Sequence, residues 1–248
     1  MLMINADDWG RNTLATDSTF QCYLNGRISS ASAMVFMQDS ERSAQLAKGC
    51  GINLGLHLNF TEEFTANSVP AEIRHNHQRI RTFLLSSKYT MLIYNPFLRG
   101  AFKSVCEAQV QEYVRLYGRP PSRMDGHQHM HLCTNSLVDR LLPAGIQVRR
   151  NFSFCTGEKS ALNRHYRKLV DTRLARRHRL TDYFFALPQN WNGNRLNRVF
   201  ELSKTSQVEL MTHPEIEAEY EYLMSDGFSC LIGSAAFASS GAGALARN

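Results

Sequence analysis

Two adjacent carboxylates, Asp7 and Asp8, stand directly after a short apolar run near the start of the chain. Histidines follow other apolar runs in the same way, at His57, at His127, His129 and His131, and at His213. Carboxylates and imidazoles are common ligands of divalent metal ions, and both can transfer protons near neutral pH. One carboxylate and two imidazoles would hold an ion and leave positions open for water and substrate, as in catalytic zinc sites.

The two aspartates are expected to have different roles, because adjacent residues on an extended chain point in opposite directions. One of Asp7 and Asp8 would bind the ion, and the other would accept a proton from the activated water. A nearby cation would keep the second carboxylate ionised at neutral pH. His213 would protonate the leaving group from the far side. Each residue also has an ordinary interpretation as a helix cap or a structural histidine, but their joint occurrence at several strand ends favours a site.

These residues need elements that bring them to one place, and the apolar runs of the chain predict a parallel sheet. Eight runs with strand character are separated by stretches of helical period. The runs are Leu2–Asn5, Ser30–Phe36, Ile52–Phe60, Ser122–His131, Gly145–Arg150, Asp182–Leu187, Gln207–His213 and Phe228–Gly233. An amphipathic helix is predicted over Ser104–Gly118. A closed barrel and a flat doubly wound sheet both fit, and both gather chemistry at the carboxyl ends of the strands.

Length and composition predict one domain over residues 1–233, followed by a poorly ordered tail of small residues over 234–248. The chain has 248 residues, of which 43% are hydrophobic and 20% charged. The first residues lack the basic flank and long apolar stretch of a signal peptide, and no apolar run reaches about 18 residues, so we expect a cytoplasmic protein that does not span a membrane. Its six cysteines are scattered without a Cys-x-x-Cys pair, which predicts free thiols and no disulfides.

The formal charge of +6 is concentrated in one predicted helical stretch. Between Lys159 and Arg179 there are eight Lys or Arg residues and one acidic residue, Asp171. Two interpretations stay open: a solvated helix face, or attraction to a phosphate-bearing substrate or an acidic membrane surface. A nucleic-acid partner is not expected, because no recognisable module accompanies the charge.

Four motifs resemble those of the YdjC-like carbohydrate deacetylases, the family of chitooligosaccharide deacetylase and of the hopanoid-biosynthesis deacetylase. They are NADDWG, GLHLNF, DGHQHMH and MTHPE, which occur in this order between Met1 and Glu215. The resemblance implies a distorted (β/α) TIM-like barrel of the glycoside hydrolase/deacetylase type. It also implies removal of an N-acetyl group from an amino sugar with one divalent ion, Zn²⁺ or Mg²⁺.

The resemblance also assigns site residues. It implies Asp8, His57 and His127 as metal ligands, Asp7 as general base, and His213 as general acid or oxyanion partner. Two positions depart from the family pattern: Trp9 stands where Phe is usual, and Gln128 interrupts what is often a run of three histidines.

Several further residues are candidates around this set. On an extended strand His127, His129 and His131 would share one face, so either later histidine could replace His127 or orient it, as could Asp125. Contact with substrate is expected from Trp9, Arg149 or Trp191, although Arg149 could also be a surface arginine and Trp191 a packing residue.

The expected partner is an N-acetylated sugar, either free or linked to a nucleotide, phosphate or lipid. Peripheral membrane contact and a homodimer are both compatible with the sequence. Another metal-dependent hydrolase, such as a phosphoesterase, and a non-catalytic glycan-binding protein are the alternative functions.

Overall fold

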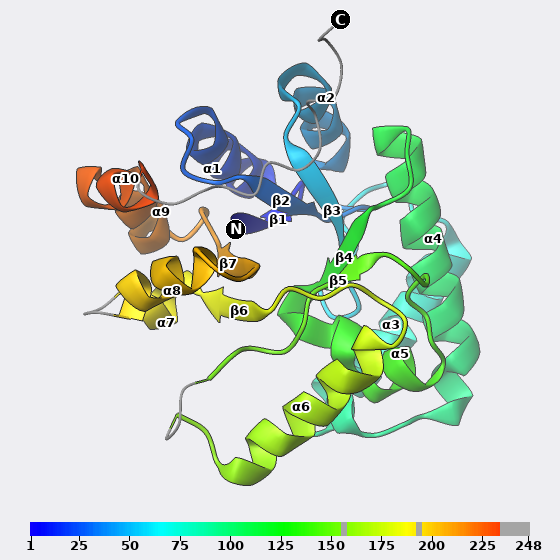
Figure 1. Cartoon of the computed structure of the whole chain (residues 1–248). Coiled ribbons are helices and arrows are strands. Elements are labelled where there is room, and N and C mark those ends of the chain that lie inside the picture. Colours follow the sequence, from blue (N-terminus) through cyan, green and yellow to red (C-terminus); the bar gives the residue numbers. More distant parts are fainter. Residues whose placement is uncertain (155–157, 192–194, 234–248) are drawn as a thin grey trace, which may run out of the picture.

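Seven parallel strands form one curled sheet in the computed structural model, which describes residues 1–154, 158–191 and 195–233. The strand order is β5-β4-β3-β2-β1-β7-β6. The strands are β1 Leu2–Trp9, β2 Ser30–Ala33, β3 Asn53–Leu58, β4 Arg123–Gly126, β5 Gln147–Val148, β6 Tyr183–Ala186 and β7 Val208–Thr212. Figure 1 shows the sheet surrounded by helices, in the form of a curled half-barrel. The predicted α/β barrel class is confirmed in this distorted form.

Helices connect the strands and cover the outside of the sheet (Figure 1). The α-helices are α1 Thr13–Leu24, α2 Ser40–Cys50, α3 Ala71–Leu85, α4 Arg99–Tyr117, α5 Thr134–Val138, α6 Ala161–Ala175, α7 Leu187–Asn190, α8 Arg195–Ser203, α9 Glu217–Met224 and α10 Asp226–Gly233. The described residues also form three 3₁₀ helices, η1 Thr90–Leu92, η2 Pro96–Leu98 and η3 His127–Leu132. The helix predicted over Ser104–Gly118 is confirmed within α4, which ends at Gly118 in the left-handed conformation (φ 71°).

The two faces of the sheet differ in polarity, because successive side chains on a strand point to opposite faces. One set of alternating residues, which includes Leu56 and Leu210, is apolar and belongs to the main hydrophobic core. The other set is polar yet buried, and comprises Asn5, Asp7, Ser30, Ser32, His57, Arg123, Asp125 and Glu209. Hydrogen bonds join these residues across strands: Asn5 Nδ2 donates to Ser32 Oγ (2.9 Å) and Ser30 Oγ donates to Asn5 Oδ1 (3.0 Å). The inside of the half-barrel is therefore a polar network.

Gly55 on β3 leaves room for the Arg123 side chain to pass over β3. The Arg123 guanidinium reaches over β3 and donates from Nη2 to the Ala31 carbonyl (2.9 Å). A Cβ at Gly55 would lie 2.9 Å from both the Nε and the carbonyl oxygen of Arg123, closer than atoms pack. A larger residue at this position would therefore displace the arginine.

The eighth predicted strand is wrong, because Phe228–Gly233 belongs to helix α10. Ser225 caps this helix, since its Oγ accepts a hydrogen bond from the Phe228 N–H (3.2 Å). Phe228 and Ile232 are buried while Cys230 between them is exposed, which fits a helix, because all three would share one face of a strand. By composition this short apolar run fits a strand or a helix, and the Ser225 cap favours the helix.

Two further expectations concern the cysteines and the end of the chain. The five cysteines within the described ranges are free thiols, namely Cys22, Cys50, Cys106, Cys133 and Cys230. Cys155 and the expected tail over 234–248 lie outside the described residues. No helix within the described ranges has the length and apolar character needed to cross a bilayer.

Candidate metal centre and active site

A bend at Asp8 turns both adjacent carboxylates toward the same group. The pairing of β1 with β2 shifts register between Ala6 and Trp9, and Asp8 adopts the left-handed conformation with φ 65°. Aspartate enters this region at less cost than most residues. Asp7 Oδ2 and Asp8 Oδ1 consequently lie 4.0 Å and 3.3 Å from Nε2 of His57.

Asp8, His57 and His127 form a group of metal donors at the carboxyl ends of β1, β3 and β4. Asp8 Oδ1 lies 3.3 Å from His57 Nε2 and 3.0 Å from His127 Nδ1. One donor atom from each residue lies within 4.8 Å of the others. Asp8 and His57 are buried, while the His127 side chain is 13% exposed and opens the group to solvent. Two imidazoles and one carboxylate fit a zinc-type ion with open positions.

A carboxylate stands behind each imidazole and orients it. His57 Nδ1 donates to Asp125 Oδ1 (2.7 Å), which directs Nε2 toward Asp8. His127 Nε2 lies 3.1 Å from Glu62 Oε2, which directs Nδ1 toward Asp8. Carboxylates in this position fix the tautomer of a metal-binding histidine and increase its basicity. Burial lowers the pKa of His57, but the surrounding carboxylates outweigh burial and raise it to about 10.

Arg149 occupies the centre of the half-barrel and binds three buried carboxylates. Its Nη1 and Nη2 each donate to Asp7 (2.6 Å), its Nη2 lies 3.0 Å from Asp125 Oδ2, and its Nε donates to Glu209 (2.7 Å). Burial opposes ionisation of Asp7, but the charges of Arg149 and His57 outweigh it and lower the Asp7 pKa. Asp7 is therefore ionised at neutral pH.

A second possible donor group comprises Asp7, His57 and Asp125. Arg149 already supplies positive charge to both of its carboxylates, so an added divalent ion would be repelled there. The Asp8 carboxylate is paired with a guanidinium less closely, because Nη1 of Arg11 lies 3.5 Å from Oδ2. The Asp8 group therefore fits an ion better.

The three histidines of DGHQHMH do not share one face, contrary to the expectation from an extended strand. β4 ends at Gly126, and Gln128 (φ 52°) and His129 (φ 59°) both adopt the left-handed conformation within η3. These two bends separate the three side chains. Only the first of them, His127, lies in the donor group formed with Asp8 and His57.

The two later histidines have other surroundings. His129 packs against the rings of Phe152 (4.7 Å) and Phe184 (5.8 Å). His131 Nε2 donates to the Arg149 carbonyl (3.0 Å). Burial lowers the pKa of His129 to about 3 and that of His131 to about 4, so both are neutral.

His213 follows β7 and remains protonated at neutral pH. Burial lowers its pKa, but Glu219 on α9, with Asp7 and Asp8 across the site, outweighs burial and raises it to about 9. Glu219 Oε1 lies 3.6 Å from Nδ1 of His213, and its other oxygen accepts from the His213 backbone N–H (2.9 Å). The imidazole is 26% exposed, so its charged form can meet a ligand.

The three candidate substrate contacts, Trp9, Arg149 and Trp191, have different surroundings. Arg149 is buried among carboxylates and is not a surface residue. Trp9 is fully buried and packs near Phe20 (6.4 Å), so it does not face a ligand. Trp191 is half-buried against Tyr222 (5.4 Å).

A cavity of about 350 Å³ adjoins the histidine motif and offers other contacts. It begins at Gln128 and His129 and extends between η1 and α6, where Tyr89, Tyr166 and Arg167 line it. Aromatic rings and a cation of this kind suit the apolar face and the hydroxyls of a sugar.

Three residues that contact the candidate site were not expected from the sequence: Arg11 and Glu62 beside the donor group, and Glu219 beside His213. Arg11 Nε donates to Glu62 Oε1 (2.8 Å), which completes the chain from Arg11 through Glu62 to His127. Their positions in the sequence could have indicated two of them. Arg11 directly follows the motif NADDWG, and Glu62 lies two residues after the motif GLHLNF.

The fold and the donor group define a class, an α/β half-barrel protein with a candidate divalent-metal centre at the carboxyl edge of its sheet. The family model described as YdjC-like protein matches residues 1–233. The chain belongs to the YdjC-like family.

Curated relatives match part of the chain. A chitooligosaccharide deacetylase of Proteus mirabilis is 27% identical over 133 residues, which cover 53% of this chain and 50% of the relative. A carbohydrate deacetylase of Mus musculus is 30% identical over 136 residues, which cover 53% of this chain and 43% of the relative. The matched region thus spans about half the length of these curated relatives.

The fold has a counterpart among solved structures. A protein of Enterococcus faecalis named for cellobiose-phosphate cleavage superposes with a TM-score of 0.61 at 16% identity. The superposition covers 94% of this chain and 93% of that one. At this identity the likeness shows the shared fold.

Arg149 and its neighbour Arg150 provide a matched test of the buried carboxylate cluster. Arg149→Met leaves Asp7, Asp125 and Glu209 without their cation, and should lower the free energy of unfolding by about 3–5 kcal/mol. Arg150→Met removes a half-exposed pair with Asp171 and should cost clearly less. Urea denaturation of both variants measures the difference. Equal losses would contradict the central position assigned to Arg149.

Proposed function

We propose that this chain is a carbohydrate N-deacetylase that uses one divalent ion. The observation that carries the proposal is the separation of the two adjacent aspartates, with Asp8 in a donor group and Asp7 held on Arg149. Family membership and relatives named carbohydrate deacetylases support the same reaction class. The substrate would be an N-acetylated amino sugar, and the products acetate and the free amine.

Asp8, His57 and His127 would hold the ion. When bound, it would supply a Lewis acid for the amide carbonyl and for the attacking water. Two nitrogen donors favour zinc over magnesium, which prefers oxygen ligands. The carboxylates of Asp125 and Glu62 would keep both imidazoles in the required tautomer.

Asp7 and His213 would move the protons. Asp7 is ionised and would accept the proton that water loses as its oxygen bonds to the carbonyl carbon. His213 is protonated and would donate to the amine nitrogen as the C–N bond breaks. Arg149 would position Asp7, because it donates one hydrogen bond to each of the two carboxylate oxygens.

Neutralising the two aspartates separately tests the proposed function. Asp8→Asn should lose zinc affinity and activity together, whereas Asp7→Asn should keep zinc and lose about 10²- to 10⁴-fold in turnover. Zinc affinity is measured by competition with a chromophoric chelator, and turnover by acetate release from N-acetylated sugars, free, nucleotide-linked and lipid-linked. Loss of zinc by Asp7→Asn alone would reverse the two roles. Phosphate release without acetate release would replace the deacetylase by a phosphoesterase.

The pH dependence tests His213 as the acid. A group that acts as an acid must be protonated, so activity should be lost as the pH rises through the His213 pKa of about 9. Asp7, Asp8, Glu215 and Glu219 are the charged groups that act on it. Glu219→Gln removes one of these charges, so the alkaline limb of kcat should move to lower pH by about one unit or more.

The exposed Glu217, on the same helix, provides the control for this pH profile. Glu217→Gln should leave the alkaline limb in place. An unchanged limb in Glu219→Gln would exclude His213 as the acid.

A further inference from the structure

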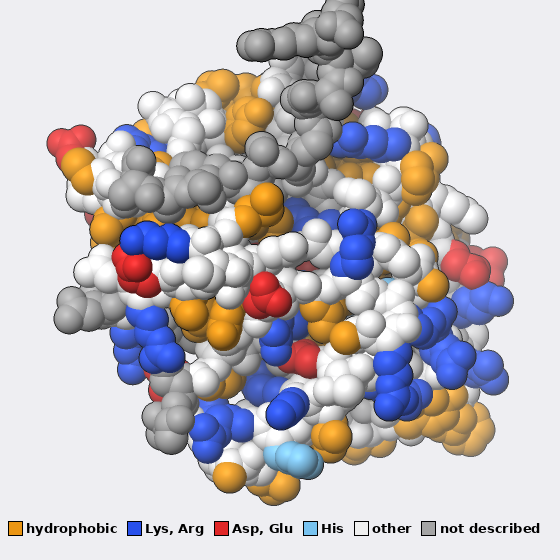
Figure 2. All heavy atoms as spheres, in the orientation of Figure 1, with side chains coloured by type: hydrophobic (Ala, Val, Ile, Leu, Met, Phe, Trp, Pro, Cys, Tyr) orange, Lys and Arg blue, Asp and Glu red, His pale blue; other side chains and the backbone are white. Residues whose placement is uncertain are grey.

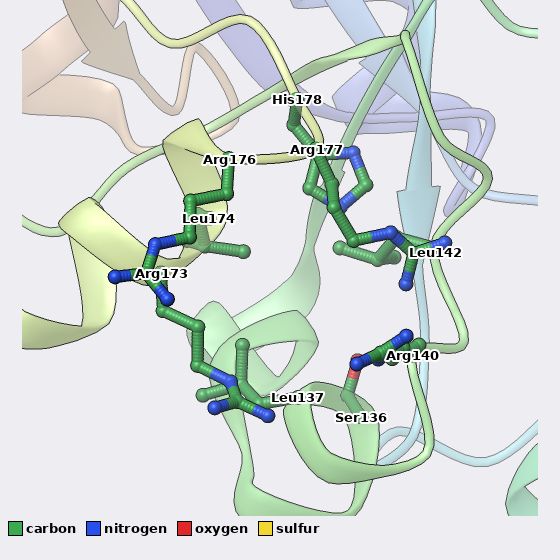
Figure 3. A pocket seen from close by; sticks show the side chains of 9 residues that line it. All are labelled: Ser136, Leu137, Arg140, Leu142, Arg173, Leu174, Arg176, Arg177 and His178. Carbon is green, nitrogen blue, oxygen red and sulfur yellow. The ribbon is translucent and has the colours of Figure 1, made fainter.

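A second pocket lies between α5 and the end of α6, and it shares no residue with the candidate metal centre. Its volume is about 270 Å³. The residues that line it are Ser136, Leu137, Arg140, Leu142, Arg173, Leu174, Arg176, Arg177 and His178. Figure 3 shows Arg140 and Arg177 on one side of the hollow and Arg173 and Arg176 on the other. Lys and Arg side chains also gather on the lower part of the face in Figure 2, around α6.

The four arginines of this pocket have no acidic partner among the described residues. No carboxylate lines the pocket, and none of the four forms an ion pair with a residue in the described ranges. Other surface arginines of the chain do form pairs, as Arg42 does with Asp17 and Asp39 (2.8 Å each). Four like charges around one hollow repel one another, and a bound anion would offset that repulsion.

Two uncharged polar atoms at the pocket also lack a partner within the part of the chain that the structure describes. Ser136 is 1% exposed, and its Oγ has no hydrogen bond with a described residue. The buried Nδ1 of His178 likewise has none within the described part of the chain. Buried polar atoms without partners are costly and uncommon, so each calls for an explanation. An oxyanion could accept a hydrogen bond from the Ser136 hydroxyl.

The backbone that carries these side chains is fixed to the sheet. Gly145 N–H donates to the Arg177 carbonyl (2.8 Å), and Arg179 N–H donates to the Ile146 carbonyl (3.0 Å). Arg179 also pairs with Gln147 of β5 in a parallel bridge. A site on a fixed backbone loses less entropy when it binds a ligand.

We propose that this pocket binds a phosphate-class oxyanion at a site separate from the deacetylase centre. Guanidinium groups match phosphate oxygens with paired, charge-assisted hydrogen bonds, and four of them favour more than one negative charge. Leu137, Leu142 and Leu174 form the apolar part of the pocket lining. The basic segment recognised in the sequence thus contributes three arginines to a second binding site.

Calorimetric titration of the full-length chain with inorganic pyrophosphate tests the proposal. Arg140→Gln combined with Arg177→Gln should weaken binding by at least about tenfold, since both lose charge-assisted hydrogen bonds. Arg173→Gln with Arg176→Gln changes the opposite side and should weaken it in the same direction. Lys168→Gln with Arg119→Gln removes the same charge outside the pocket and should leave affinity unchanged. Equal affinity in the unchanged chain, both pocket variants and the control variant would contradict a soluble ligand at this pocket, and so would no binding by the unchanged chain. The proposal is overturned if the vesicle experiment below fails as well.

A vesicle arm identifies the source of the phosphate group. Sedimentation is measured with phosphatidylcholine vesicles, with and without phosphatidic acid. Binding that needs phosphatidic acid and is lost in Arg140→Gln/Arg177→Gln supports the proposal with a lipid headgroup as the source. Binding of pyrophosphate but not of vesicles, again lost in Arg140→Gln/Arg177→Gln, supports the proposal with a soluble phosphate compound as the ligand. Failure of both arms overturns it and leaves deacetylation untouched, because acetate release is measured separately.

Discussion

The buried guanidinium of Arg149 is the interaction on which the rest of the half-barrel depends. It follows β5 near one edge of the sheet and binds carboxylates on β1, β4 and β7. Three buried carboxylates without this cation would repel one another and lose their hydration without compensation. Arg149 therefore links strands that the open sheet does not pair, and it also keeps Asp7 ionised. The ion pair between Arg149 and Asp7 thus contributes to the stability of the fold and to the charge of the proposed general base.

The local backbone at Asp8 explains how two neighbouring residues of one type come to differ. A continued strand would send one carboxylate outward, but the bend at Asp8 keeps both at the carboxyl edge. Asp7 meets a guanidinium and Asp8 meets two imidazoles. Two carboxylates with different partners can take different parts in a metal-assisted hydrolysis, as the proposed function requires.

Much of this could be predicted from the sequence, because strand ends of a parallel sheet meet at one edge. That rule brings the strand-end aspartates and histidines together, and the family resemblance selects Asp8, His57 and His127 among them. The role of Arg149 could not be predicted, since its burial depends on three strands distant in sequence. The separation of the later histidines was missed because Gln128 and His129 carry no sequence signal for left-handed backbone. These misses are tertiary effects that periodicity does not encode.

The central claim is that Asp8, His57 and His127 hold the ion while Asp7 remains on Arg149. Anomalous diffraction at the zinc edge, from crystals of the zinc-loaded protein, tests it most directly. We expect one peak at about 2.0–2.2 Å from a carboxylate oxygen of Asp8 and a ring nitrogen of each histidine. We also expect that Asp7 keeps both hydrogen bonds to Arg149. A peak between Asp7 and Asp125, with the guanidinium displaced, would contradict it.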